Sequence, residues 1–528
     1  MFVPLSVLEF RDRAERYFGD KVGVIDGDRS LTYREYAERT HRLASALRRL
    51  GVEPGDRVSF ITYNTHQLLE AYYGVPEAGA VLNPINIRLA PEEIGYILDH
   101  AGSKVVLFHA DFAPLVARIA PTLATRPTFV VMEGQPGGDA AAEYEALLAA
   151  AAVDEPPAAV DENAMAALFY TSGTTGRPKG VALTHRALYL HSLQTAVSLR
   201  VTDADVILQV VPLFHVNGWG TPHWMTMVGG THVMLRRFDP AAFLTLVERH
   251  RVSYLLGVPT IFNAVLNSPE LAAHDHSSLR YVLVGGAPSS PALIRSLEER
   301  LGVTALVGYG LTETSPVLTC AWPRHHLLQT EPPQRRLERQ ASTGWPVPGV
   351  ALRVVDWADA DVRPDGQQLG EIVVRSNVVM DGYYREPDAT ADSIRDGWFH
   401  TGDMATFDEQ GYVTIKDRSK DIIISGGENI SSVEIENALY VHPAVFECAV
   451  VAAPDETWGE VPVALVVLKP DSPATVDELL AHCREHLAGF KVPKRIELRE
   501  ELPKSGTGKL LKGQLREPFW EGYEARVH

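Results

Sequence analysis

Short apolar runs alternate with amphipathic segments along the chain as far as about residue 320. The runs are bounded by turn residues and indicate buried strands, at residues 22–26, 58–63, 81–82, 105–108, 128–132, 166–169, 206–211, 232–235, 254–256, 281–284 and 304–307. Helical periodicity occupies the intervals, and the helix over residues 33–51 follows a capping box of Thr32 and Glu35. Strands that alternate with helices in this way predict two doubly wound parallel sheets that are covered by helices.

The alternation changes beyond residue 320. Strand patterns then follow one another without long helices, at residues 351–356, 371–375 and 412–416. They indicate a small and mostly antiparallel β unit at about residues 340–417. After it, strand patterns and helical segments indicate a compact α+β domain of ordinary size. The expected fold class is α/β, with a large N-terminal domain over residues 1–417 and a small C-terminal domain over residues 418–528.

The composition excludes several classes of protein. The chain has 528 residues, which is too long for one hydrophobic core, and its formal charge of −18 disfavours binding to nucleic acids or anionic membranes. No apolar run approaches the roughly 20 residues of a membrane span, and the N-terminus lacks the apolar core of a signal peptide. The three cysteines are far apart and form no disulfide framework. We therefore expect a cytoplasmic protein with no nucleic-acid partner and no integral membrane association.

Residues 170–180 carry the densest candidate chemistry. They read Tyr-Thr-Ser-Gly-Thr-Thr-Gly-Arg-Pro-Lys-Gly and are expected to join the strand at residues 166–169 to a helix. Glycines let backbone amides approach an anion closely, hydroxyls donate hydrogen bonds or bind a metal, and Arg177 and Lys179 add positive charge. The pattern indicates a polyphosphate-binding loop, although Lys179 is followed by Gly180 and not by the Ser or Thr of a Walker A loop. A flexible surface connection is the alternative for this segment alone.

Two segments that follow predicted strands carry candidate binding residues, because ligands bind at the carboxyl ends of strands in open α/β sheets. His215 follows the strand at residues 206–211 and either orients a substrate carboxylate or is a structural histidine. The nearby Trp219 indicates a pocket or core wall. Residues 285–288, Gly-Gly-Ala-Pro, either let a flat ring lie against bare backbone or form a tight turn.

Residues 308–314 follow a third predicted strand and combine three kinds of polar group. Tyr309 offers a ring face for stacking, and Thr312 offers a hydrogen-bond donor. Glu313 offers a carboxylate, which can hold magnesium when a phosphate loop lies beside it, since magnesium prefers carboxylate and phosphate oxygens. A lone glutamate on a loop is otherwise a solvated side chain.

Two later segments add an acid and cations. Asp403 follows a tight aromatic turn and can accept hydrogen bonds from both hydroxyls of a ribose, and Arg418 can add a second contact. Residues 503–509, Pro-Lys-Ser-Gly-Thr-Gly-Lys, indicate a mobile loop that delivers a cation, with a basic and frayed tail as the alternative.

Taken together, these segments resemble the adenylate-forming superfamily, which contains the acyl-CoA synthetases, the adenylation domains of peptide synthetases and firefly luciferase. The motifs follow the family's order over nearly the whole chain, at residues 170–180, 308–314, 401–403, 417–421 and 503–509. Each motif is short, but five in this order are specific. The similarity is greatest to fatty-acyl-CoA synthetases, because residues 214–219 resemble the segment whose aromatic residue lines or gates their acyl tunnel.

The resemblance implies an AMP-forming acyl-CoA synthetase, which is an acid–thiol ligase. Such an enzyme adenylates a carboxylic acid with ATP and releases pyrophosphate, and it then transfers the acyl group to CoA and releases AMP. Mg²⁺ is the implied cofactor, and ATP and CoA are the co-substrates. The resemblance also implies that the small C-terminal domain is mobile and rotates about a hinge at Lys420 between the two half-reactions.

The resemblance assigns roles to individual residues. The implied catalytic residues are Lys509, His215, Thr174 and Glu313, of which Lys509 bridges the carboxylate and the α-phosphate and Thr174 and Glu313 lie near magnesium. The implied nucleotide- and CoA-binding residues are Thr171, Ser172, Gly173, Thr175, Gly176, Lys179, Gly286, Ala287, Pro288, Gly308, Tyr309, Gly310, Thr312, Asp403, Arg418, Lys420, Gly426 and Gly427. The implied acid-binding residues are His215, Val216, Trp219 and Gly310.

The sequence indicates the acid substrate and the acyl acceptor less clearly than the reaction. Residues 425–429 resemble short-chain, medium-chain and aryl-acid enzymes as much as long-chain ones, so an aryl- or short-chain ligase is the alternative to a medium- or long-chain fatty-acyl ligase. No Gly-x-Asp-Ser carrier site follows residue 509, which favours free CoA over a carrier protein as the acceptor. A non-catalytic nucleotide-binding protein is the alternative of a different class, and it predicts loss of Lys509, Glu313 or Asp403, all of which are present. The oligomeric state stays open, a homodimer included.

Overall fold

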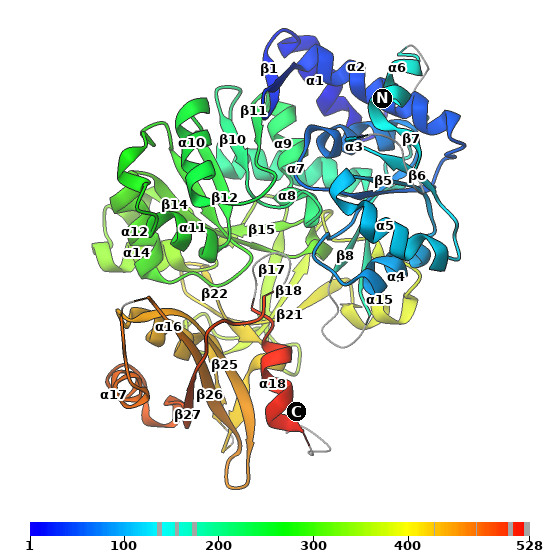
Figure 1. Cartoon of the computed structure of the whole chain (residues 1–528). Helices are drawn as coiled ribbons and strands as arrows, with labels where there is room; N and C mark the ends of the chain where they lie inside the picture. The colour runs from blue at the N-terminus through cyan, green and yellow to red at the C-terminus, as the bar shows by residue number, and fades with distance from the viewer. Residues whose placement is uncertain are drawn as a thin grey trace.

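The computed structural model describes residues 1–134, 140–153, 158–171, 177–426, 428–470, 472–504 and 510–521. Figure 1 shows a large N-terminal domain with two helix-covered α/β subdomains, and a separate C-terminal domain beyond them. The predicted α/β fold class is confirmed in this arrangement.

The first sheet contains strands from both ends of the N-terminal domain. In spatial order its strands are β19 (Gly382–Tyr383), β9 (Lys179–Thr184), β8 (Met165–Thr171), β4 (Val81–Pro84), β3 (Arg57–Ile61), β5 (Ser103–Phe108), β6 (Thr128–Val131) and β7 (Ala140–Glu143). The pairs from β8 to β7 are parallel, as predicted, whereas β9 is antiparallel to β8 and β19 is antiparallel to β9.

The second sheet is parallel through its middle. In spatial order its strands are β16 (Trp345–Pro346), β15 (Val317–Cys320), β14 (Thr304–Gly310), β13 (Tyr281–Val284), β12 (Tyr254–Gly257), β10 (Val206–Gln209), β11 (Thr231–Met234), β1 (Val22–Asp26) and β2 (Arg29–Thr32). One hydrophobic cluster includes Phe60 from the first sheet and Leu283 from the second, so the two subdomains share a core.

Helices cover both sheets and one side of the C-terminal domain. They are α1 (Leu8–Phe18), α2 (Tyr33–Arg49), α3 (His66–Glu77), α4 (Pro91–Ala101), α5 (Ala113–Ile119), α6 (Tyr144–Ala150), α7 (His185–Leu199), α8 (Val216–Trp219), α9 (Thr221–Val228), α10 (Pro240–His250), α11 (Pro259–Leu266), α12 (Pro291–Leu301), α13 (His325–Leu328), α14 (Pro333–Ala341), α15 (Pro387–Ser393), α16 (Ser432–Val441), α17 (Val476–His486) and α18 (Lys512–Trp520). The predicted capping box at the start of α2 is confirmed, because Thr32 and Glu35 exchange both hydrogen bonds. In the described part of the chain, the helices lack the combined length and apolar character needed to cross a bilayer.

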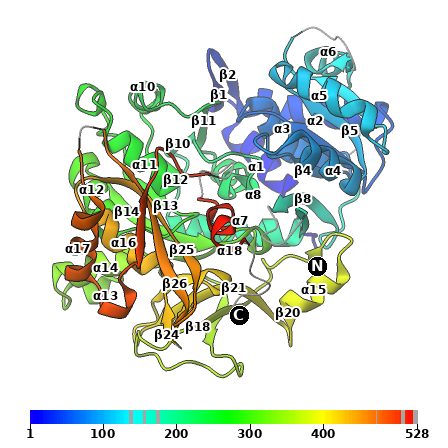
Figure 2. The same cartoon turned by 60° about the horizontal axis from the view of Figure 1, so that its bottom comes forward.

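The β unit and the C-terminal domain form two further sheets. The β unit is antiparallel and contains β17 (Ala351–Val355), β18 (Gly370–Arg375), β20 (Ile394–Arg395), β21 (Trp398–Phe407) and β22 (Val413–Arg418). The C-terminal sheet contains β23 (Ile423–Ser425), β24 (Glu428–Ile430), β25 (Val445–Asp455), β26 (Gly459–Leu468) and β27 (Arg495–Leu498). Its core, which includes Ile423, Leu439 and Val450, is separate from the core of the N-terminal domain. Figure 2 shows this sheet in front of the β unit, with α18 beside β25.

One local expectation was wrong. Residues 170–180 join β8 to the antiparallel strand β9, and α7 begins only after it, because residues 179–184 pair along the whole of β8. Strand β1, at the start of the chain, joins the second sheet beside β11. Neither pairing can be recognised from periodicity, since a strand carries no mark of its distant partner.

A buried ion pair joins the first helix, α1, to helix α3. The guanidinium of Arg11 on α1 pairs with Glu77 on α3 and donates a hydrogen bond to Thr40 Oγ1 at 3.0 Å. His41 Nδ1 lies 2.6 Å from the second oxygen of Glu77. Arg11 and Glu77 are each 2% exposed, so the loss of one partner would leave the other charge buried and unpaired.

The substitution Arg11→Ala is expected to lower the free energy of unfolding of the N-terminal domain by about 3 kcal/mol, because it leaves the Glu77 carboxylate without its main counter-charge. Urea unfolding followed by tryptophan fluorescence measures the change. The control is Arg34→Ala, whose partner Asp20 lies 3.0 Å away in an exposed pair and whose loss should cost below about 1 kcal/mol. Equal effects of the two substitutions would contradict this assignment.

Candidate active site

Tyr383, on the short strand β19, contacts residues from both α/β subdomains. Its hydroxyl donates a hydrogen bond to Glu313 Oε1 at 2.9 Å, and Lys179 Nζ lies 5.0 Å from the centroid of its ring. Lys179 begins β9, whereas Glu313 lies in the turn that follows β14. The hairpin at residues 170–180 and the turn at residues 308–314 are therefore neighbours in space.

The structure describes only the two ends of the predicted phosphate-binding segment at residues 170–180. Thr171 and Lys179 are paired across β8 and β9, and Thr171 Oγ1 donates to the Lys179 carbonyl at 3.4 Å. The predicted binding residues between them lie outside the described residues, and these are Ser172, Gly173, Thr174, Thr175 and Gly176. Of these ends, the one at Lys179 lies beside Tyr383.

Asp403 joins the end of β14 to the end of β22. Tyr309 Oη donates a hydrogen bond to Asp403 Oδ2 at 2.8 Å, and Arg418 Nε lies 3.2 Å from Asp403 Oδ1. Asp403 and Arg418 are paired residues of β21 and β22, which fixes their separation. Asp403 raises the pKa of Arg418, and burial raises the pKa of Tyr309 well above its usual value, so both groups stay hydrogen-bond donors.

Glu313 is a buried carboxylate beside this group. It is 9% exposed and lies on η4 (Thr312–Thr314) together with the buried Thr312. Burial raises the pKa of Glu313, while the hydrogen bond from Tyr383 and the charge of Arg418 act in the opposite direction. A buried carboxylate near the Arg418 guanidinium can bind a cation or accept a hydrogen bond from a ligand, since an uncompensated charge is costly in a medium of low dielectric.

The glycines after β13 accommodate Trp219. A Cβ added to Gly285 would lie 3.0 Å from Trp219 Cη2, and one added to Gly286 would lie 3.3 Å from Trp219 Cζ2. The sequence left open whether these glycines receive a flat ring or form a tight turn, and in the structure the Trp219 indole lies against them. Ala287 and Pro288 continue the same turn at the surface. On the next strand, a Cβ at Gly310 would lie 1.6 Å from the Pro316 carbonyl oxygen, so this position excludes a side chain.

The segment that carries Trp219 has an unusual backbone. Val216, Asn217 and Trp219 have φ values of 30°, 56° and 59°, and the intervening Gly218 is also left-handed. Left-handed backbone is costly for a β-branched residue such as Val216, and such strain persists only where the surroundings enforce it. Val216 and Trp219 are buried, and His215, which precedes them, is half-buried.

Predicted residues of the C-terminal domain lie on its first turns. Lys420 lies in η5 (Ser419–Asp421), directly after β22, and burial lowers its pKa to about 8. Gly426 has φ 60°, and a Cβ there would lie 2.7 Å from Trp458 Cε3. Two of these predicted residues lie outside the described residues, namely Gly427, which the resemblance places among the nucleotide- and CoA-binding residues, and Lys509, the implied catalytic cation.

Sequence reasoning missed Tyr383. The only signal at residues 382–384 is the short motif Gly-Tyr-Tyr, which does not form a strand-length apolar pattern. Its position follows from the pairing of β19 with β9, which places Tyr383 opposite Val181. The residues that the structure does bring together are Lys179, Tyr309, Glu313, Asp403 and Arg418.

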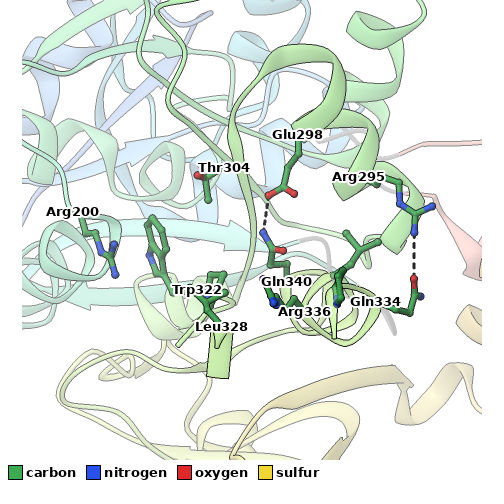
Figure 3. A pocket seen from close by; sticks show the side chains of 12 residues that line it. Arg200, Arg295, Glu298, Thr304, Trp322, Leu328, Gln334, Arg336 and Gln340 are labelled. Atoms are coloured by element: carbon green, nitrogen blue, oxygen red, sulfur yellow. Dashed lines mark hydrogen bonds between the residues drawn. The ribbon is translucent and has the colours of Figure 1, made fainter. Parts of the chain in front are cut away.

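A separate cavity of about 580 Å³ lies at the opposite end of β14. Figure 3 shows its walls, which come from α12, α14, Thr304 and Trp322 and include the guanidinium groups of Arg200, Arg295 and Arg336. Thr304 begins β14, whereas Tyr309 is near its end, so this cavity is distinct from the candidate site. In the part of the chain that the structure describes, no group of three His, Cys, Asp or Glu side chains could hold a metal ion.

Comparison with known proteins identifies the family of this chain. Residues 10–384 match the AMP-binding enzyme family, and residues 434–509 match the AMP-binding enzyme C-terminal domain. The chain belongs to the AMP-binding enzyme family. Its two matched regions correspond to the N-terminal and C-terminal domains of the structure.

The relatives of this AMP-binding enzyme are named for different acids. It is 43% identical to a long-chain-fatty-acid–CoA ligase of Thermus thermophilus, over 98% of this chain and 96% of that protein. It is 37% identical to a peroxisomal benzoate–CoA ligase of Arabidopsis thaliana, over 98% of this chain and 93% of that protein. The crystal structure of the anthranilate CoA ligase AuaEII with anthranoyl-AMP superposes with a TM-score of 0.91 at 27% identity, over 99% of both chains. The protein is therefore an AMP-forming acyl-CoA ligase.

Proposed function

We propose that this ligase activates a medium- or long-chain fatty acid with ATP and transfers the acyl group to CoA, with release of AMP and pyrophosphate. The observation that carries the proposal is the meeting of Lys179 and Glu313 at Tyr383, beside the Tyr309–Asp403–Arg418 group. A phosphate hairpin, a carboxylate and a ribose-sized pair of polar groups would then face one nucleotide. The similarity to a long-chain-fatty-acid–CoA ligase and the Trp219 segment support a fatty acid.

In this proposal, different described residues bind different parts of the nucleotide. Asp403 and Arg418 would hold the ribose, and Tyr309 would flank the adenine opposite Gly286. Lys179 would lie beside the phosphates, where cationic side chains stabilise the negative charge that builds up on the leaving pyrophosphate. Positioning and electrostatic stabilisation suffice for such a reaction, because the carboxylate nucleophile needs no proton removed.

Glu313 suits a magnesium ion that is shared with the nucleotide. Mg²⁺ commonly takes one or two protein carboxylates and completes its shell with phosphate oxygens and water. Glu313 is such a carboxylate, it is buried, and it lies beside the ends of the phosphate hairpin; Thr174 would add a hydroxyl. The bound ion would neutralise phosphate charge, while Glu313 itself keeps its place through Tyr383.

A specific observation also supports an aryl acid. The chain is 37% identical to a benzoate–CoA ligase, and a ligase solved with anthranoyl-AMP shares its fold over nearly the full length. Trp219 packed against Gly285 and Gly286 would offer an aromatic wall to either kind of acid. Free CoA is the proposed acceptor, with a carrier protein as the alternative.

We further propose a domain boundary at Lys420, with the domains over residues 1–417 and 418–528, and a cytoplasmic location. The separate hydrophobic core around Ile423 supports the boundary. The three cysteines are buried and free in the structure, which suits a reducing compartment.

CoA-dependent AMP formation from acetate, hexanoate, palmitate, benzoate and coumarate tests the proposed function. Hexanoate or palmitate should give the highest kcat/KM, and pyrophosphate release should require both ATP and the acid. A preference for benzoate or coumarate would replace the fatty acid by an aryl acid. ATP binding without acid-dependent pyrophosphate release would instead favour a non-catalytic nucleotide-binding protein.

Trp219→Ala is expected to change the preference among acids. Removal of the indole from its position against Gly285 and Gly286 should change the palmitate-to-hexanoate ratio of kcat/KM by about tenfold, since a few methylenes in an apolar pocket are worth that much. The control is Trp357→Ala, because that indole is 81% exposed. An unchanged ratio for Trp219→Ala would show that Trp219 does not line the acyl site.

Lys509→Ala is expected to affect only the first half-reaction. Loss of one cation at the reacting phosphate should slow acid-dependent ATP–pyrophosphate exchange by about 10²-fold or more. Thioester formation from synthetic acyl-adenylate and CoA should stay close to wild type. Lys504→Ala is the control in the same segment, because that ammonium pairs with Glu447 at 2.9 Å. Equal losses in both half-reactions would refute a role confined to adenylation.

A further inference from the structure

A chain of buried polar contacts connects the last helix to the end of β22. Lys512, the first residue of α18, lies 2.8 Å from Glu436 Oε1 and donates a hydrogen bond to Ser432 Oγ at 2.6 Å. The backbone N–H and the hydroxyl of Ser432 both donate to Asp417 Oδ2, at 2.7 Å and 2.5 Å. The Ser432 hydroxyl therefore links the ammonium of Lys512 to the Asp417 carboxylate.

Burial makes this chain of contacts sensitive to the loss of any member. Asp417 is 3% exposed and Ser432 is fully buried, and the Lys512 side chain is only 16% exposed. Burial would lower the pKa of Lys512, but the carboxylates of Glu436 and Asp417 raise it further than burial lowers it. The ammonium thus stays charged and holds two carboxylates that would otherwise repel each other in a medium of low dielectric.

Helix α18 also contacts the residues that follow Arg418 in the chain. Arg516 lies one turn after Lys512 on α18, so the two side chains share a helix face. Arg516 Nη1 donates to the Lys420 carbonyl at 3.1 Å and lies 3.2 Å from Asp421 Oδ1. In the chain, Arg418 therefore lies between Asp417, which Lys512 reaches through Ser432, and Lys420, which Arg516 contacts directly. The Arg418 side chain itself pairs with Asp403.

We propose that Lys512 is a positioning residue of the nucleotide site, which acts through Ser432 and Asp417 to hold Arg418 on Asp403. The proposal rests on the proposed nucleotide-binding role of Asp403 and Arg418. It means that the ribose contacts are complete only while α18 is packed against β22. Lys512 would in this way set the affinity for the nucleotide from a distance, without touching it.

Lys512→Met tests the proposal, because it removes the charge and keeps an unbranched side chain. The Kd for AMP, measured by titration calorimetry, should rise about tenfold, and the KM for ATP in pyrophosphate exchange should rise similarly. The kcat and the KM for the acid should change less than about threefold. Lys512→Arg should restore most of the affinity. The matched control is Lys491→Met, whose ammonium pairs with Glu434 on the same helix at 2.7 Å but at the surface.

A second variant separates positioning from folding. Ser432→Ala keeps the Lys512–Glu436 pair and removes the hydroxyl that reaches Asp417, so it should weaken AMP binding in the same direction with a thermal unfolding midpoint close to wild type. Unchanged AMP affinity in both variants, or equal rises in KM for ATP and for the acid with a lowered midpoint, would overturn the role of Lys512. Because AMP binding needs no turnover, this result is independent of which acid the ligase uses.

Discussion

The Asp403 carboxylate is the contact on which the arrangement of the site depends. One oxygen accepts the hydroxyl of Tyr309, which ends a central strand of the second sheet, and the other faces Arg418, the last residue of β22. Both contacts lie in a buried setting, where hydrogen bonds to a charged group are stronger than at the surface and where removal of a partner is costly. The carboxylate thus joins the α/β core to the β unit at Arg418, which lies two residues before the proposed hinge at Lys420.

Trp219 and the glycines after β13 pack together as one wall of the candidate site. Trp219 can lie against Gly285 and Gly286 only because neither glycine carries a Cβ. The backbone that presents the indole is left-handed over successive residues, and the side-chain amide of Asn217 within it is buried without a hydrogen-bond partner among the described residues. A strained segment of this kind is costly for folding, and its cost is compatible with a role in positioning the indole.

The C-terminal domain adds buried charge where its first helix and its last helix meet β22. A buried ion cluster contributes little net stability, since desolvation offsets much of the attraction, but it is strongly disrupted by a small displacement. The contacts of Lys512 and Arg516 around Arg418 therefore favour one docked arrangement of the two domains. This property suits a ligase whose proposed nucleotide site includes Arg418, on the strand that leads into the second domain.

The sequence by itself determined the alternation of strands and helices, the antiparallel β unit, the separate C-terminal domain and the short polar turns that carry the site, because periodicity, caps and glycines act over a few residues. It could also name Tyr309, Glu313 and Asp403, since each lies in a turn of recognisable composition. Only the tertiary structure decided that β1 joins the second sheet, that the antiparallel strand β9 pairs with β8, that Trp219 packs against Gly286, and that Tyr383 contacts both Lys179 and Glu313. These contacts join residues far apart in the chain, and they depend on strand pairing and side-chain packing, which leave no local pattern in the sequence.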